Sequence, residues 1–93
     1  MKPPSHIKIK NKCVYEIVHI DTFRDPEVLG ECRFSERQIV IKKGQTEKQE
    51  WKTICHEILH SICEERGIDI SHKSIYQLEE ALYYVVFHNK WEK

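Results

Sequence analysis

The segment between Thr46 and Gly67 constrains the fold most, because it carries the start signal, the periodicity and the stop signal of one long helix. Thr46 is a favourable N-cap residue, and Gln49 three positions later fits a capping box. Gly67 suits the position after the last helical residue, where the backbone often turns left-handed. The apolar residues that recur on one face at helical spacing are Trp51, Ile54, Cys55, Ile58, Leu59 and Ile62. The chain therefore has to cover one face of a helix that ends near Arg66.

The half of the chain before this helix is rich in strand-forming residues. Apolar and β-branched residues dominate four short stretches, at residues 7–10, 14–20, 31–34 and 38–42. Residues 22–30, which include Pro26 and Gly30, are expected to form a loop. Residues 35–37 are a plausible hairpin connection between the last two strands. The pattern predicts a sheet built before the helix begins.

A second helix is predicted from residue 74 to about residue 89, after a connection at residues 68–73. It is apolar over most of its circumference, which makes the adjacent carboxylates Glu79 and Glu80 conspicuous. With 93 residues, 40% apolar and 32% charged, the chain suits one globular domain, residues 1–93. We expect the α+β class: a small antiparallel sheet of three to four strands, an active-site helix, and a second, glutamate-bearing helix.

Charge and hydropathy argue against several classes of partner. Lys plus Arg and Asp plus Glu number 15 each, so no overall field attracts nucleic acid or an anionic membrane. The longest apolar runs, residues 83–87 and 39–41, are far shorter than the roughly 20 residues of a membrane span, and residues 1–12 lack the apolar core of a signal peptide. The four cysteines contain no Cys-x-x-Cys pair and are expected to be reduced. These features predict a cytoplasmic protein.

The first helix contains the uninterrupted motif His56-Glu57-Ile58-Leu59-His60. Histidines four residues apart share a helical face, so their ring nitrogens can converge on one tetrahedral ion at about 2.0–2.1 Å. Glu57 turns away from the ligands but stays beside the metal, where it can accept a proton from zinc-bound water. The pattern predicts a zinc-dependent hydrolase with His56 and His60 as Zn²⁺ ligands and Glu57 as the catalytic base.

A catalytic zinc site normally has three protein ligands and one open position, so a third ligand has to come from elsewhere. The candidates are Glu64, His72, Glu79, Glu80 and His88. Glu79 and Glu80 fall on the two sides of the second helix's apolar arc, so periodicity does not choose between them. A carboxylate that is not a ligand could still orient a ligand histidine through a hydrogen bond.

A His-Glu-x-x-His helix followed by a glutamate on the next helix resembles the gluzincin metallopeptidases, of which thermolysin is a large member. Glu80-Ala81 matches the Glu-Ala pair that follows the motif in thermolysin-like enzymes, so the resemblance implies Glu80 as the third zinc ligand. Residues 30–87 are also similar to short His-Glu-x-x-His proteins of phages and mobile elements, related in pattern to the ImmA/IrrE metallopeptidases. The resemblance implies a peptidase that acts on a protein or peptide substrate.

Large gluzincins use an additional His or Tyr to stabilise the oxyanion. Several residues of this chain have the required chemistry, and the sequence does not decide among them. They are His72, Tyr76, Tyr83, Tyr84 and His88.

Two functional hypotheses stay open on the sequence alone. In the first, an extended peptide binds antiparallel to an exposed edge strand, for which residues 38–42 are the best candidate, and is hydrolysed at the zinc site. In the second, a non-catalytic zinc-stabilised module binds a protein partner, and four protein ligands close its metal site. Imidazole and carboxylate ligands would also accept nickel or cobalt. The number of protein ligands discriminates between the two hypotheses.

Overall fold

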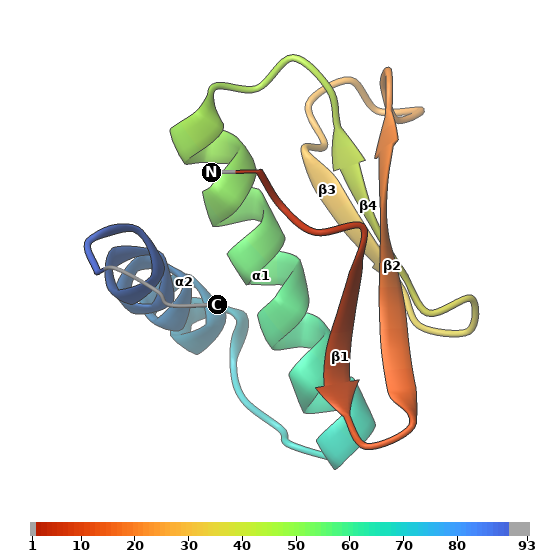
Figure 1. Ribbon diagram of the computed structural model, residues 1–93, viewed down its shortest axis with the longest axis vertical. Coiled ribbons are helices and arrows are strands. Elements are labelled where there is room, and N and C mark those ends of the chain that lie inside the picture. Colours follow the sequence, from red (N-terminus) through yellow and green to blue (C-terminus); the bar gives the residue numbers. More distant parts are fainter. Residues whose placement is uncertain (1, 90–93) are drawn as a thin grey trace.

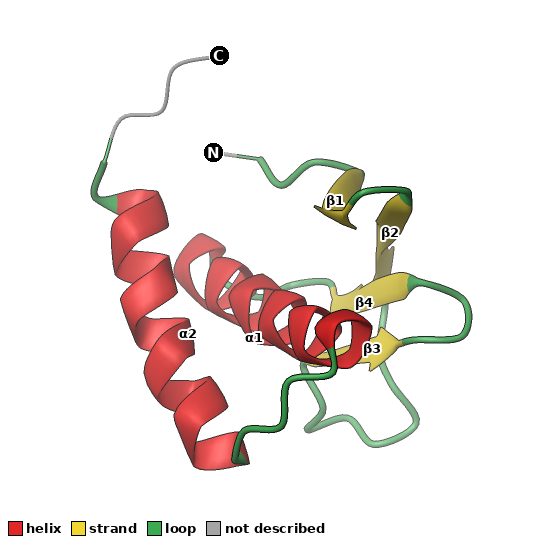
Figure 2. Cartoon of the chain, turned by 90° about the horizontal axis from the view of Figure 1, so that it is seen from below, coloured by secondary structure: helices red, strands yellow, loops and turns green. Residues whose placement is uncertain are grey.

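The computed structural model describes residues 2–89 and contains four strands followed by two helices (Figure 1). The elements are β1 (His6–Lys10), β2 (Cys13–Ile20), β3 (Gly30–Arg33), β4 (Gln38–Lys42), α1 (Glu47–Arg66) and α2 (His72–Phe87). The strands form one sheet, α1 lies across one face of it, and α2 lies beside α1 on the side away from the sheet (Figure 2). The predicted α+β class and order of elements are confirmed.

The sheet is mixed, with the order β1-β2-β4-β3, and not purely antiparallel as expected. Its two outer pairings are antiparallel, but β2 and β4 run parallel, with Val18 opposite Val40. β4 lies between β2 and β3, and its Ile39, Val40 and Ile41 are all fully buried, as in strands covered on both faces. The prediction that residues 38–42 form an exposed edge is therefore wrong. The edge strand beside β4 is β3.

The two cap residues predicted from the sequence, Thr46 and Gly67, mark the ends of α1. The Oγ1 atom of Thr46 accepts a hydrogen bond from the N–H of Gln49 at 3.2 Å, and Gly67 adopts a left-handed φ of 65°. The buried face of α1 packs on the sheet through Ile54. The core cluster comprises Cys13, Tyr15, Ile17, Ile39, Ile41 and Ile54. All four cysteines are free thiols. The helix is thus fixed at both ends and along one face, which makes it a rigid platform for the motif.

The second helix begins two residues earlier than predicted, because Ser71 caps it. The Oγ atom of Ser71 accepts a hydrogen bond from the N–H of Ser74 at 3.1 Å, so His72 belongs to the first turn of α2 and not to the connection. Among the elements of residues 2–89, α2 packs against α1 alone, and Ile75 is its fully buried side chain. Neither helix in this range combines the length and apolar character needed to cross a membrane.

Candidate metal centre

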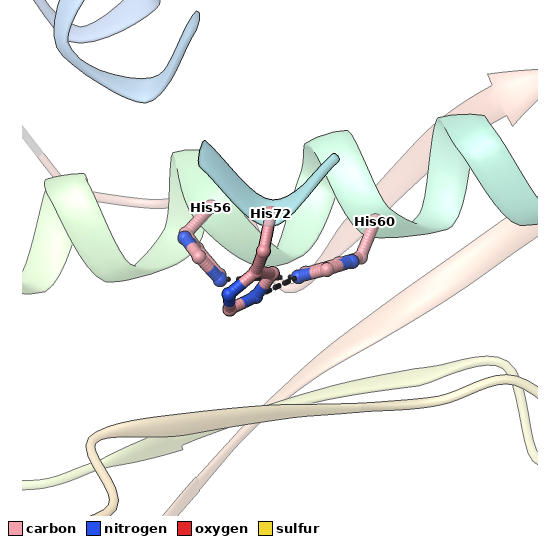
Figure 3. A group of neighbouring side chains, drawn as sticks. All are labelled: His56, His60 and His72. Atoms are coloured by element: carbon pink, nitrogen blue, oxygen red, sulfur yellow. Dashed lines mark hydrogen bonds between the residues drawn. The ribbon is translucent and has the colours of Figure 1, made fainter. Parts of the chain in front are cut away.

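Three histidine side chains from two helices meet where α1 and α2 pack together (Figure 3). His56 and His60 lie one turn apart on α1, and His72 comes from the first turn of α2. The Nε2 atom of His60 is 3.1 Å from Nε2 of His56 and 3.1 Å from Nε2 of His72. Donors bound to one tetrahedral zinc at 2.0–2.1 Å are about 3.3 Å apart, so this spacing fits the ligands of a single ion. The three histidines lie close enough to bind a metal ion.

The second ring nitrogen of His56 is held by Glu79 on α2. The Nδ1 atom of His56 lies 2.7 Å from Oε1 of Glu79, and each side chain is only 13% exposed. A carboxylate in this position keeps the proton on Nδ1 and leaves Nε2 free to bind a metal. Glu79 therefore has the geometry of a residue that orients a ligand.

Glu80, which the resemblance implies as the third ligand, is not brought to the histidines. Its carboxylate pairs with Lys52 on α1, and its side chain is 63% exposed. Successive residues of a helix are rotated by about 100°, so Glu80 is turned away when Glu79 faces His56. Within residues 2–89, the side chains grouped closely enough to hold a metal are the three histidines. The structure thus favours His72 over Glu80 as the third ligand.

The histidines line a cavity of about 470 Å³ that also contains the carboxylate of Glu57. Residues 27–30 form one wall, Gln49 and Thr53 line the cavity from α1, and Tyr76 and Glu79 line it from α2. The cavity therefore brings together the motif of α1, the first half of α2 and the start of the edge strand.

The ionisation of the cavity side chains follows from their burial. Glu57 is buried, and this desolvation, together with the negative charges of Glu31 and Glu79, raises the pKa of its carboxyl to about 7. Desolvation and the neighbouring rings of His56 and His72 lower the pKa of His60. A lowered pKa favours the neutral imidazole, which is the form that binds metal ions.

Gly30 allows the edge strand to lie directly against α1. A Cβ atom at this position would lie 2.5 Å from Cγ2 of Thr53 and 3.2 Å from Oε2 of Glu57. The neighbouring carbonyl of Leu29 accepts a hydrogen bond from Nε2 of Gln45 at 3.2 Å, and Oε1 of Gln45 accepts one from Thr53 at 2.9 Å. These contacts hold the start of β3 beside the carboxylate of Glu57.

Sequence reasoning included His72 among five possible ligands but did not select it, and it did not identify the wall formed by residues 27–30. A sequence signal for His72 was available in Ser71, which is a good N-cap residue. A helix capped at Ser71 begins at residue 72, so His72 belongs to its first turn. The wall depends on tertiary contacts and has no local signal. No protein-family model, no curated protein and no solved structure matches the chain.

Proposed function

We propose that this chain is a zinc-dependent peptidase in which His56, His60 and His72 hold the ion and Glu57 is the general base. The observation that carries the proposal is the convergence of three Nε2 atoms at a cavity that also contains a buried carboxylate. Three protein ligands leave the fourth position of a tetrahedral ion for water or substrate, whereas a purely structural site is closed by four. The donor set thus supports the catalytic hypothesis.

The chemistry divides between the ion and the residues around it. When bound, zinc supplies Lewis-acid polarisation of the scissile carbonyl and lowers the pKa of a water molecule. Glu57 takes a proton from the attacking water as the water oxygen bonds to the carbonyl carbon. It then gives this proton to the amine nitrogen as the C–N bond breaks. Glu79 acts through His56, whose ring it orients.

The outer edge of β3, which pairs with no strand of residues 2–89 other than β4, supports a peptide substrate. The N–H of Lys42 donates to the carbonyl of Leu29 at 3.0 Å, which sets the phase of the antiparallel β3–β4 ladder. In such a ladder, the residues between hydrogen-bonded pairs direct their N–H and C=O groups away from the partner strand. Gly30 and Cys32 are these residues, so their backbone groups face the outer edge. An extended peptide paired there would pass the cavity at Gly30, and β3 replaces residues 38–42 as the proposed docking strand.

Replacing the base while keeping the ligands tests the proposal. Glu57→Gln should lower peptide hydrolysis about 10²–10⁴-fold and keep one zinc per chain, because Glu57 is assigned as a base and not as a ligand. The measurement is digestion of a peptide library by the zinc-loaded protein, with metal content determined on the same samples. Glu64→Gln, on the same helix but outside the cavity lining, is the matched control. Normal turnover by Glu57→Gln would rule out its assigned role.

The alternative, a non-catalytic zinc-stabilised module that binds a protein partner, has one observation in its favour. Large apolar side chains are exposed along α2, namely Tyr76, Leu78, Tyr84 and Val85. Exposed apolar surface of this kind is common at protein-binding sites. A zinc-loaded wild-type chain that cleaves no peptide of the library would favour this alternative over the peptidase.

A further inference from the structure

The side-chain amide of Gln45 links the end of β4 to two parts of the chain that line the cavity. Gln45 lies in the connection between β4 and α1. Its Nε2 atom donates hydrogen bonds to the carbonyl of Lys42 at 2.9 Å and to the carbonyl of Leu29 at 3.2 Å. Its Oε1 atom accepts a hydrogen bond from Oγ1 of Thr53 at 2.9 Å. Both N–H groups and the oxygen of the amide are therefore engaged, each with a different segment.

Two of these partners lie beside the groups of the proposed reaction. Leu29 is followed by Gly30, where the bound peptide would pass the cavity, and both residues line it. Thr53 is buried and precedes Glu57 by about one turn of α1. Gln45 itself does not line the cavity, so it can act on the reaction only through these neighbours.

The packing of β3 on α1 limits movement of the strand in one direction only. A Cβ atom at Gly30 would lie 2.5 Å from Cγ2 of Thr53, so the strand already touches the helix and cannot move towards it. Movement away from the helix is opposed by hydrogen bonds to the carbonyl of Leu29. The N–H of Lys42 donates to this carbonyl at 3.0 Å and holds it to β4, whereas Gln45 also joins it to α1 through Thr53. Gln45 is therefore placed to fix the distance between the outer edge of β3 and the helix that carries the base.

We propose that Gln45 is a positioning residue that holds the outer edge of β3 in register with Glu57 and the histidines; this inference rests on the proposed peptidase function. A peptide paired with β3 takes its position from Gly30, whereas the proton of the attacking water goes to Glu57 on α1. Because Gln45 joins the two elements, it sets where the scissile carbonyl lies relative to the base. A misplacement of about 1 Å can cost about 10²-fold in rate. A substrate too short to pair with β3 does not depend on this contact.

Gln45→Met tests this role, because methionine has nearly the length of glutamine but lacks its amide donors and carbonyl acceptor. In the zinc-loaded chain, kcat/KM for a peptide of about ten residues selected from the library should fall about 10–100-fold. The peptide is then shortened to the smallest fragment that wild type cleaves, for which the loss should stay within about threefold. Loss of zinc or of folding would lower both rates alike, and zinc content is measured on the same samples. Equal losses for the two substrates, or no loss for either, would overturn the role of Gln45.

The matched control is Gln38→Met, which removes a side-chain amide from the other end of β4. Nε2 of Gln38 donates to Oε1 of Glu16 on β2 at 3.2 Å, so its loss leaves the link between β3 and α1 intact. This variant should keep wild-type kcat/KM for both substrates.

Hydrogen exchange without substrate separates this inference from the peptidase proposal. The N–H of Lys42 donates to the carbonyl of Leu29, which Gln45 also holds. In Gln45→Met the Lys42 amide should exchange about 10–100-fold faster, whereas amides in the middle of α1 and the Lys42 amide of Gln38→Met should exchange as in wild type. Unchanged exchange at Lys42 would overturn the role of Gln45. Faster exchange in a chain that cleaves no peptide would support the contact made by Gln45 and overturn the peptidase proposal instead.

Discussion

Oε1 of Glu79 lies 2.7 Å from Nδ1 of His56, although the two residues are 23 positions apart and belong to different helices. Both side chains are largely shielded from solvent. The other nitrogen of the same imidazole, Nε2, lies 3.1 Å from Nε2 of His60. One contact therefore both joins α2 to α1 and sets the orientation of a ring in the histidine cluster.

Glu79→Gln should weaken zinc binding about 10–100-fold, because an amide keeps the shape of the side chain but loses the charge that holds the His56 proton on Nδ1. Competition with a chromogenic chelator at neutral pH measures the effect. Glu80→Gln, one residue further along, provides the control and should bind zinc as wild type does. Unchanged affinity in Glu79→Gln would show that the contact contributes nothing to the metal site.

His72→Ala should lose more zinc affinity than Glu79→Gln, by a factor above about 100, because it removes a donor and not only a residue that orients one. The same chelator competition ranks the variants. If Glu80→Gln lost more affinity than His72→Ala, the ligand set implied by the gluzincin resemblance would be correct and the histidine set would be wrong.

Chelation should destabilise the chain and loosen α2 before α1. Zinc at about 1,000 times its Kd adds about 4 kcal/mol to the free energy of unfolding, provided that it binds the folded state alone. Within residues 2–89, α2 packs on α1 alone and Ile75 is its one fully buried side chain, so its amides should lose more protection from hydrogen exchange than those of α1. Equal protection of α2 with and without zinc would contradict a coupling between the metal and this helix.

Gly30→Ala should destabilise the fold by about 1–3 kcal/mol, because the added Cβ would lie 2.5 Å from Cγ2 of Thr53. Urea denaturation measures the change. Thr53→Ser removes the obstructing methyl group and keeps the hydroxyl, so the double variant Gly30→Ala/Thr53→Ser should recover much of the loss. Absence of any recovery would mean that the clash does not explain the effect.

The loss of folding stability at low pH should depend on the contact between Tyr15 and Glu65. The hydroxyl of Tyr15 donates to Oε2 of Glu65 at 2.7 Å, and this hydrogen bond lowers the pKa of the carboxyl. The pKa of Glu65 is also lowered by Cys13, Arg37 and Lys10. A carboxyl with a lowered folded-state pKa contributes stability above its unfolded value, near pH ~4.3, and loses it as the pH falls through the folded-state value.

Tyr15→Phe should therefore be less stable than wild type at pH 7, and the difference should narrow towards pH 3. Urea denaturation at several pH values measures this convergence. A stability difference that stays constant over this range would show that Tyr15 acts through packing and not through the charge of Glu65.

The two helices show which features of the fold could be predicted from local sequence signals. The limits of α1 could be predicted because Thr46 and Gly67 act through backbone contacts with their immediate neighbours. The predicted start of α2 was two residues late because Ser71, unlike Thr46, has no Glu or Gln three positions later, so no capping box marks its cap. This placed His72 in the connection and not in the helix. The motif identified two members of the histidine cluster from their spacing alone. The third depends on how the helices pack.

The order of the strands could not be predicted from local sequence patterns. A buried strand is indicated by the apolar run Ile39, Val40 and Ile41. Burial alone, however, does not determine which strands pair with it. The parallel pairing of β2 with β4 and the antiparallel hairpin of β3 with β4 together make β4 internal. The choice between Glu79 and Glu80 has the same origin, because it depends on which side of α2 faces α1.

The side chains assigned to the metal centre lie in one continuous stretch, residues 56–79, and only 12 positions separate His60 from His72. Closing a loop of this length costs little chain entropy and takes roughly 10–100 ns. A metal ion can therefore meet its ligands as soon as the two helices form a hairpin. The long-range pairing of β2 with β4 is the slower event. Zinc would then speed folding by providing an early nucleus on which the sheet assembles.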